Sequence, residues 1–126
     1  MKVLVTGGAG YIGSVVVEQL LAQGDTCVVY DNLSVGHAAS IDPGATFVQG
    51  DLNDHARLIT TLEHYEIEAV VHLAAVSLVR ESMAHPHFYF ANNVSGGITL
   101  LDAMRITGVK QLVYSSSAAV YGVPST

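Results

Sequence analysis

The sequence predicts an α/β fold with one parallel sheet, and three observations support this prediction. Short apolar runs rich in β-branched residues alternate with longer amphipathic segments. A glycine-rich turn joins the first run to the first amphipathic segment. Of the 126 residues, 50% are hydrophobic and 13% are charged, so a buried core is expected. Strand–helix–strand alternation at this spacing needs right-handed crossovers, which make neighbouring strands parallel.

The first two strands flank one helix. Residues 2–6 form an apolar run without polar alternation, which is typical of a strand buried on both faces. Residues 11–23 carry a broad apolar stripe at helical spacing, and Gly24 is placed to end that helix. Residues 26–30 predict the second strand, which ends at Asp31.

The middle of the chain adds a loop, a strand, a helix and another strand. Residues 31–44 are rich in Asn, Ser, Gly and Pro and predict a loop. Residues 46–49 predict the third strand. Asn53 or Asp54 can cap a helix that runs to about Tyr65, because their side chains accept hydrogen bonds from first-turn amides. The fourth strand is expected over residues 68–73.

A long helix and a fifth strand complete the pattern. Pro86 suits the first turn of a helix that runs to about Thr107, and residues 110–114 predict the fifth strand. Gly96 and Gly97 inside this helix cost roughly 1 kcal/mol each relative to Ala, which suggests close packing there. The alternative is a loosely packed surface that tolerates glycine. The apolar residues that share one side of the helix are Val94, Ile98, Leu101 and Met104.

These elements predict a Rossmann-type parallel sheet with strand order 3-2-1-4-5. No domain boundary interrupts residues 1–126, so one nucleotide-binding domain is expected. The fifth strand would be an open edge with unpaired backbone groups. We therefore expect low stability or self-association of this chain on its own.

The glycine-rich turn carries the main functional signal. Gly7, Gly10 and Gly13 stand between a predicted strand and a predicted helix. In a dinucleotide-binding fold this turn must bend sharply, let a pyrophosphate touch the backbone and let the helix approach the strand. The start of the helix adds free amide groups and the positive end of the helix dipole. The sequence therefore predicts a phosphate-binding loop rather than a plain turn.

An acidic residue follows the next strand. Asp31 lies where a carboxylate can accept hydrogen bonds from an adenosine ribose diol and would repel a 2′-phosphate. No Arg or Lys lies between Lys2 and Arg57 to bind such a phosphate, so NAD is favoured over NADP. Turn formation is the competing interpretation for Asp31, since Asp-Asn is also turn chemistry. Asp51 ends the third strand in a comparable position and is expected near the adenine.

Ser115, Ser116 and Ser117 follow the fifth strand, at the sheet edge where ligands bind in such folds. A hydroxyl there can hydrogen-bond a substrate alcohol, although a serine-rich turn is the plain alternative. The six histidines do not suggest a metal site, because His85 and His87 are the only close pair and no third ligand stands near them. His72, in an apolar strand, is expected to be a hydrogen-bonded core histidine.

Composition excludes several classes of protein. With 5 Lys+Arg against 11 Asp+Glu, the chain is unsuited to nonspecific nucleic-acid binding. Its single cysteine, Cys27, cannot form an intrachain disulfide and is expected to be a buried apolar side chain. No apolar run approaches the ~20 residues that span a bilayer, and no signal peptide is visible. A cytoplasmic protein without a membrane partner is expected.

Six stretches together carry a family resemblance. They are residues 6–13 (TGGAGYIG), 31–34 (DNLS), 50–52 (GDL), 72–75 (HLAA), 92–94 (NNV) and 115–122 (SSSAAVYG). In this order they resemble the N-terminal part of the extended short-chain dehydrogenase/reductase family, most closely its UDP-sugar 4-epimerase branch. The resemblance covers essentially the whole chain. It implies a homodimeric full-length protein that interconverts UDP-glucose and UDP-galactose through a 4-keto intermediate with bound NAD.

The resemblance also assigns residues to the site. The amides of Tyr11 and Ile12 join the glycines at the pyrophosphate, and Ser117 matches the catalytic serine that hydrogen-bonds the reacting oxygen. The cofactor-binding set that it implies is Gly7, Gly10, Tyr11, Ile12, Gly13, Asp31, Asn32, Asp51, Leu52, Leu73, Ala74, Ala75, Asn92 and Ser115.

Two departures from the family pattern bear on activity. The catalytic Tyr-x-x-x-Lys pair of the family is absent, because no tyrosine in this chain is followed four residues later by lysine. The chain is therefore expected to be an inactive N-terminal fragment that lacks the Tyr/Lys segment and the substrate domain. Ser77 stands where many UDP-glucose epimerases have lysine, which leaves other nucleotide-sugar epimerases open.

Two alternatives remain. A nucleotide-sugar dehydratase uses an Asp-Glu pair where this chain has Ala118 and Ala119, which counts against that activity. A non-catalytic NAD-sensing module on the same fold is the second alternative.

Overall fold

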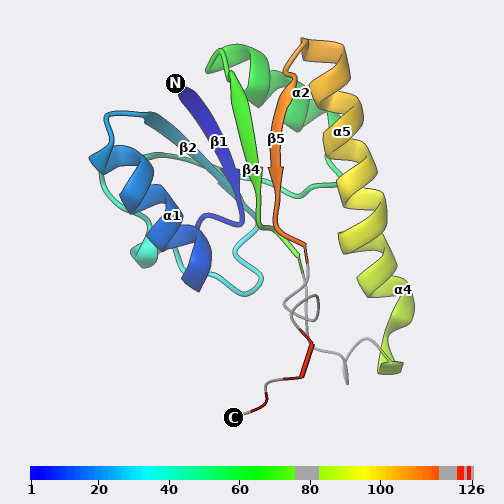
Figure 1. Cartoon of the computed structure of the whole chain (residues 1–126). Coiled ribbons are helices and arrows are strands. Elements are labelled where there is room, and N and C mark those ends of the chain that lie inside the picture. Colours follow the sequence, from blue (N-terminus) through cyan, green and yellow to red (C-terminus); the bar gives the residue numbers. More distant parts are fainter. Residues whose placement is uncertain (76–82, 117–121, 124, 126) are drawn as a thin grey trace.

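The computed structural model describes residues 1–75, 83–116, 122, 123 and 125. Its centre is a parallel five-stranded sheet of order β3-β2-β1-β4-β5, which confirms the predicted order (Figure 1). The strands are β1 (Lys2–Thr6), β2 (Thr26–Asp31), β3 (Thr46–Gln49), β4 (Ala69–His72) and β5 (Gln111–Tyr114). All four pairings are parallel, so the carboxyl ends of the strands meet at one edge of the sheet.

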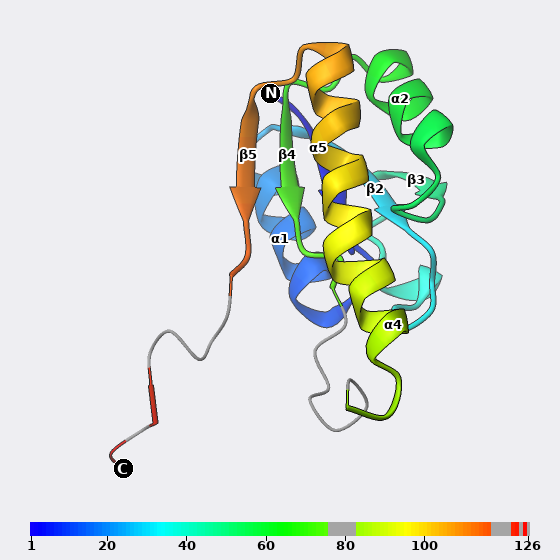
Figure 2. The ribbon, with the colours of Figure 1, turned by 90° about the vertical axis from the view of Figure 1, so that its right-hand side faces the viewer.

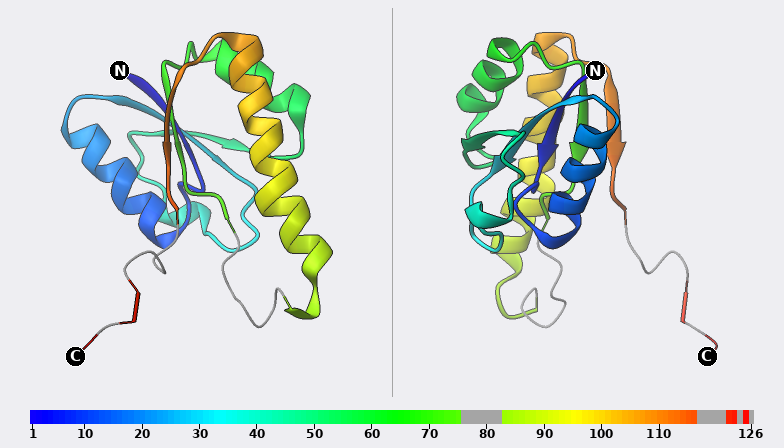
Figure 3. Two further views of the ribbon diagram at one scale, coloured as in Figure 1. Left: turned by 45° about the vertical axis from the view of Figure 1, so that its right-hand side comes forward. Right: turned by 90° about the vertical axis from the view of Figure 1, so that its left-hand side faces the viewer.

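Helices cover both faces of the sheet. Helix α1 (Tyr11–Ala22) lies on one face, and α2 (His55–His64) and α5 (Gly96–Thr107) lie side by side on the other (Figures 1 and 2). The alternation of side chains along β1 divides the core accordingly. Val3 and Val5 pack with Val17 on the α1 face. Leu4 packs with residues of α2 and α5 on the opposite face. Figure 3 shows this three-layer arrangement from two further sides.

The ends of the helices follow the sequence signals closely. Asp54, rather than Asn53, caps α2: its Oδ1 accepts a hydrogen bond from the Arg57 amide at 3.1 Å. Gly24 follows α1 with φ +90°, and Gly108 ends α5 with φ +78°. Such positive φ values favour glycine, which explains why these helices stop where they do. A short 3₁₀ turn, η1 (Ala38–Ser40), interrupts the predicted loop after β2.

The long helix predicted from Pro86 is divided into three parts. Helix α4 (Pro86–Tyr89) passes into a wider π-helical segment, η2 (Phe90–Ser95), and then into α5. The amide of Gly96 donates to Ala91 across this wide turn, and the side-chain amide of Asn53 donates to the same carbonyl oxygen at 3.0 Å. The loop after β3 therefore supports the wide turn, and single π-helical turns of this kind are frequent at functional sites.

The apolar side predicted on this helix faces outward for most of its length. Val94, Ile98 and Leu101 are about half exposed or more, and only Met104 is buried. The face of α5 that packs inward consists of Gly96, Leu100, Ala103 and Met104. The helix thus has two apolar sides, and the exposed one is available to a partner.

Gly96 and Gly97 have different surroundings. A Cβ at Gly96 would lie 2.9 Å from Leu52 Cβ, whereas nothing lies within 4 Å of one at Gly97. We expect Gly96→Ala to lower the free energy of unfolding by about 1–3 kcal/mol, because the loop after β3 would have to move. Gly97→Ala is the matched control and is expected to raise it by up to about 1 kcal/mol. Urea denaturation of both variants measures the difference, and equal effects would contradict close packing at Gly96.

Candidate functional site

The glycine loop follows β1 and is held against the neighbouring strands. The Gly7 amide donates to the Tyr30 carbonyl oxygen at 2.9 Å, and the Gly10 amide donates to the Gly7 carbonyl oxygen at 3.1 Å. Gly7 has φ +74°, and a Cβ there would lie 2.8 Å from the amide nitrogen of Ala74. A Cβ at Gly13 would lie 2.1 Å from the Gly7 carbonyl oxygen. The loop is therefore a backbone cradle that side chains would fill.

The start of α1 opens beside this cradle. Gly10 is the N-cap residue and supplies no side chain to the first-turn amides. The side chains of Tyr11 and Ile12 are 89% and 63% exposed and do not line the groove described below. Their predicted contribution is through backbone amides, which have no partner within the first turn of a helix. That contribution stays a prediction.

Asp31 joins the cradle to the loop after β2. Its carboxylate is 9% exposed, accepts the Ala9 amide through Oδ2 at 3.0 Å and accepts the Leu33 amide through Oδ1 at 2.8 Å. The second bond closes an Asx turn, so Asp31 forms a turn and also lines the groove. Each oxygen keeps one lone pair, because a carboxylate oxygen can accept two hydrogen bonds. Asp31 can therefore still accept hydrogen bonds from a ribose diol.

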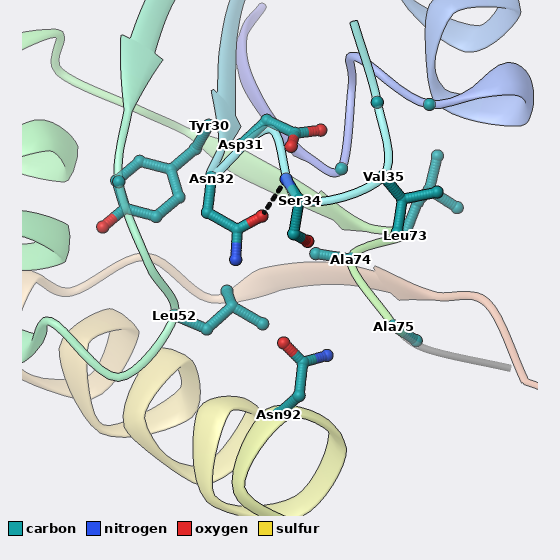
Figure 4. A pocket seen from close by; sticks show the side chains of 14 residues that line it. Tyr30, Asp31, Asn32, Ser34, Val35, Leu52, Leu73, Ala74, Ala75 and Asn92 are labelled. Atoms are coloured by element: carbon teal, nitrogen blue, oxygen red, sulfur yellow. Dashed lines mark hydrogen bonds between the residues drawn. The ribbon is translucent and has the colours of Figure 1, made fainter. Parts of the chain in front are cut away.

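A groove runs along the carboxyl edge of the sheet between these elements (Figure 4). Asp31 and Asn32 lie on one side of it, Leu73 to Ala75 on a second, and Leu52 with Asn92 on a third (Figure 4). The predicted site residues that line it are Gly7, Gly10, Asp31, Asn32, Leu52, Leu73, Ala74, Ala75 and Asn92.

Asp51, which was also predicted to bind the cofactor, has a structural role behind the groove. Its carboxylate accepts the Asn53 amide at 2.9 Å and the Asn32 side-chain amide at 3.3 Å. Its backbone oxygen accepts the Tyr30 hydroxyl at 2.7 Å. Asp51 therefore ties β2 to the loop after β3 and does not itself line the groove.

Sequence reasoning missed one wall of the groove. The missed lining residues are Tyr30, Ser34, Val35, Gly36 and Gly50. The loop after β2 folds back over the glycine loop, where the His37 amide donates to the Ala9 carbonyl oxygen at 3.1 Å. A Cβ at Gly36 would lie 2.6 Å from Ala9 backbone atoms, so only glycine permits this approach. Gly36, in the segment directly after β2, was the sequence signal that could have predicted this close approach to the glycine loop.

Gly50 is a second glycine that the sequence analysis could have used to find this wall of the groove. A Cβ at Gly50 would lie 2.5 Å from the Tyr30 hydroxyl, so this glycine makes room for the ring. Burial raises the pKa of Tyr30 to about 12, and the phenol stays protonated and donates to Asp51. Tyr30 is thus a structural donor that lines the groove.

The serines after β5 are only partly described. The Ser115 amide donates to the His72 carbonyl oxygen at 3.3 Å, which continues the β4–β5 ladder, and Ser115 does not line the groove. Ser117 lies outside the described residues. The structure therefore brings nine of the fourteen predicted cofactor residues together and leaves the predicted catalytic serine untested. The predicted residues that do not line the groove are Tyr11, Ile12, Gly13, Asp51 and Ser115.

Comparison with protein-family models shows which family the chain belongs to. The model of the NAD dependent epimerase/dehydratase family matches residues 3–126. The chain belongs to this family. Membership confirms the resemblance that the sequence motifs suggested and accounts for a glycine cradle facing an acidic residue at the end of β2.

Individual members of the epimerase/dehydratase family are similar over almost the whole chain. The UDP-glucose 4-epimerase of Lacticaseibacillus casei is 52% identical over 124 residues, which are 98% of this chain and 38% of that protein. A UDP-glucose 4-epimerase sequence of Klebsiella pneumoniae is 46% identical over 129 residues and is matched over 93% of its own length. The chain thus spans 38% of the length of the first relative and nearly all of the second.

Solved structures of epimerases share the fold. The UDP-glucose 4-epimerase of Brucella ovis in complex with NAD has a TM-score of 0.91 at 50% identity, over 99% of this chain and 38% of that one. The enzyme of Bifidobacterium longum in complex with NAD+ and UDP has a TM-score of 0.90 at 33% identity, over 100% of this chain and 40% of that one.

Proposed function

We propose that this chain is the NAD-binding part of a nucleotide-sugar 4-epimerase that interconverts UDP-glucose and UDP-galactose. The observation that carries the proposal is the groove in which a side-chain-free glycine cradle faces the carboxylate of Asp31. Relatives and structural neighbours named UDP-glucose 4-epimerases, some of them in complex with NAD, support the same activity. In this proposal residues 1–126 form one NAD-binding domain.

The residues present fit NAD. The groove is lined by Gly7 and Gly10, and helix α1 starts beside it, so its first-turn amides would face a pyrophosphate. The free lone pairs of Asp31 suit a ribose diol. None of the described residues that line the groove is Arg or Lys, so a 2′-phosphate would meet the negative charge of Asp31 without a cation to balance it. When bound, NAD would supply the acceptor for a hydride from C4 of the sugar. The protein residues would bind and orient it, with Leu52 and Asn92 beside the adenosine half.

We assign the catalytic serine to Ser117 on the family motif. The acid/base Tyr/Lys pair has no counterpart among the 126 residues, so this chain alone is expected to bind NAD without turnover. A dehydratase remains the weaker enzyme candidate, since Ala118 and Ala119 offer no acid. A non-catalytic NAD-sensing module is the candidate from another class.

Two measurements test this function. Isothermal titration calorimetry of this chain should show binding of NAD and much weaker binding of NADP, and absence of NAD binding would contradict the proposal. The longer gene product should then be assayed with a panel of UDP-sugars. Formation of UDP-galactose from UDP-glucose supports the epimerase, whereas NAD binding without turnover of any UDP-sugar would favour a sensing module.

The proposed partner of the full-length protein is a second copy. Exposed apolar side chains lie along η2 and α5, at Phe90, Val94, Ile98 and Leu101. The buried side of α5 is formed by other residues, Gly96, Leu100, Ala103 and Met104. The expected cytoplasmic location also stays a prediction. In the described part of the chain, no helix is long and apolar enough to cross a membrane.

A charge on this apolar side tests the dimer. Ile98 is 62% exposed, so Ile98→Asp should fold normally but lose association, because a buried unpaired carboxylate is costly in an interface. We expect at least a tenfold increase in the dimer dissociation constant by sedimentation of the full-length protein. Thr60→Asp, on the exposed side of α2, is the control. A dimer that is unaffected by Ile98→Asp would exclude this surface.

A further inference from the structure

Two buried polar side chains lie side by side directly beneath the groove. Thr6 is the last residue of β1, His72 is the last residue of β4, and the two are register partners in the sheet. Thr6 is 0% exposed and His72 is 5% exposed. The chain continues from them into Gly7 on one side and into Leu73 and Ala74 on the other, which are residues that line the groove.

The Thr6 hydroxyl is the centre of a small hydrogen-bond network. Its Oγ1 lies 2.6 Å from Nδ1 of His72. It also accepts the amides of Leu73 at 3.1 Å and Ala74 at 3.3 Å. The Leu73 amide has a second acceptor in the Thr6 carbonyl oxygen at 3.0 Å. The hydroxyl is thus the acceptor that fixes Ala74.

Counting donors and acceptors fixes the tautomer of His72. A threonine hydroxyl has two lone pairs and one proton. Two backbone amides, which can only donate, occupy the lone pairs, so the hydroxyl proton points to Nδ1 of His72. This arrangement assigns Nδ1 as the unprotonated nitrogen and leaves the ring proton on Nε2. An imidazolium would place a second proton between Nδ1 and Oγ1, and Oγ1 could then accept only one of the two amides. The Leu73 amide would keep the Thr6 carbonyl oxygen, whereas the Ala74 amide has no other acceptor among the described residues.

Nothing described around His72 favours the charged ring. Burial lowers the pKa of His72, and no charged group contributes to that shift. On β5 the neighbouring titratable group is the phenol of Tyr114, whose ring centre lies 5.6 Å from that of His72. On β1 the facing group is Thr6, which does not titrate. The network therefore stabilises the neutral form of His72.

The network acts where the turn after β4 approaches the glycine loop. The backbone of Ala74 lies so close to Gly7 that a Cβ on Gly7 would be 2.8 Å from the Ala74 nitrogen. The same Ala74 amide is held by Thr6. Release of that amide would let the turn after β4 move away from the glycine cradle, and the groove would lose its defined width.

We propose that Thr6 and His72 are a proton-sensitive positioning pair, which holds Ala74 against the glycine cradle only while His72 is neutral and protonated on Nε2. This inference rests on the proposed NAD function and adds a pH control to it. NAD affinity should be highest near pH 8, where His72 is neutral, and should fall as the pH drops through the titration of His72. The native state binds fewer protons than the unfolded chain between the two pKa values, so the stability from the neutral ring is lost as pH falls through that window.

Nuclear magnetic resonance of this chain, labelled with ¹⁵N, tests the pair without any ligand. The ring spectrum of His72 at pH 8 should show an unprotonated Nδ1 and a protonated Nε2. The amide signal of Ala74 should shift with the titration of His72 in the native chain and stay constant in His72→Asn, whose Oδ1 can replace Nδ1 as acceptor. A protonated Nδ1 at pH 8, or an Ala74 amide that ignores the titration, would overturn the proposal.

Calorimetry with NAD, from pH 8 down through the pH at which the ring signals of His72 titrate, tests the consequence. His72→Asn should bind NAD with an affinity close to that of the native chain at pH 8 and with no loss specific to low pH. Thr6→Val, which keeps the volume but removes the hydroxyl, should bind about tenfold more weakly at all pH values. Thr6→Ser keeps the hydroxyl and should bind normally. Native-like binding by Thr6→Val, or an unchanged pH profile in His72→Asn, would contradict the inference.

The two proposals can fail separately. If the native chain does not bind NAD at pH 8, the proposed function fails, while the tautomer of His72 and the titration of the Ala74 amide still decide whether the pair exists. If NAD binds but these signals are absent, only the positioning pair fails.

Discussion

Gly13→Ala is expected to abolish detectable NAD binding and to lower the free energy of unfolding by about 3 kcal/mol or more. The added Cβ would lie 2.1 Å from the Gly7 carbonyl oxygen and 2.7 Å from Gly8 Cα. Both neighbours are backbone atoms, so no side chain can rotate to make room. Either α1 moves away from β1 or the glycine loop opens, and both changes remove core contacts and distort the cradle.

The control is a glycine at a comparable helical position without neighbours. Gly97 lies in the second position of α5, and nothing is within 4 Å of a Cβ there. Gly13→Ala and Gly97→Ala gain the same helix propensity, so their difference isolates the contact with Gly7. Urea denaturation and calorimetry with NAD measure both effects. A Gly13→Ala variant that binds NAD normally would show that the cradle does not need this close approach.

Much of the fold could be predicted from the sequence because its signals are local. The strands are short unbroken apolar runs, and right-handed crossovers leave few ways to order them, so the strand order 3-2-1-4-5 was confirmed. Asp54 and Gly108 mark helix ends through bonds and φ values within a few residues of themselves. The glycine cradle is also a local signal, since the strand before it and the helix after it can both be predicted from the sequence.

The features that could not be predicted depend on contacts between distant segments. The π-helical turn of η2 has no signal of its own: it is supported by Asn53, 38 residues before the carbonyl oxygen that it binds. The wall formed by Ser34 to Gly36 depends on Leu33 adopting φ +62° while its amide donates to Asp31. Such a φ is uncommon for leucine, and only the completed Asx turn makes it acceptable.

The apolar periodicity of α5 shows a related limit. Hydrophobic residues occupy more than one side of this helix, and spacing alone does not say which side faces the sheet. Packing selects the side with Leu100 and Ala103, which share a buried cluster with Leu58 and Leu62 of α2 and with residues of the sheet. Ile98 and Leu101 remain on the outside. The outward apolar side of α5 thus indicates contact with a partner. The sequence of one chain does not show which apolar side packs on its own sheet and which is left for that partner.

Asp31→Asn is expected to weaken NAD binding by about 10- to 100-fold and to narrow the preference for NAD over NADP. Each carboxylate oxygen of Asp31 accepts one backbone amide, from Ala9 and from Leu33. An asparagine has only one oxygen, so in either orientation its NH₂ group opposes one of these amides. The NH₂ group also cannot accept a hydrogen bond from a ribose hydroxyl. Loss of one such bond to a charged acceptor costs about 1.5–3 kcal/mol, which corresponds to the expected loss of affinity.

The charge itself should control which dinucleotide binds. The carboxylate repels a 2′-phosphate, and asparagine does not, so NADP should lose less affinity than NAD in this variant. Asp42→Asn is the matched control, because Asp42 accepts the Gly44 amide at 2.8 Å in an exposed Asx turn outside the groove. Calorimetry with both dinucleotides measures the ratio of affinities. If Asp31→Asn discriminates between NAD and NADP as the native chain does, Asp31 is only a turn former and the selectivity must arise elsewhere in the groove.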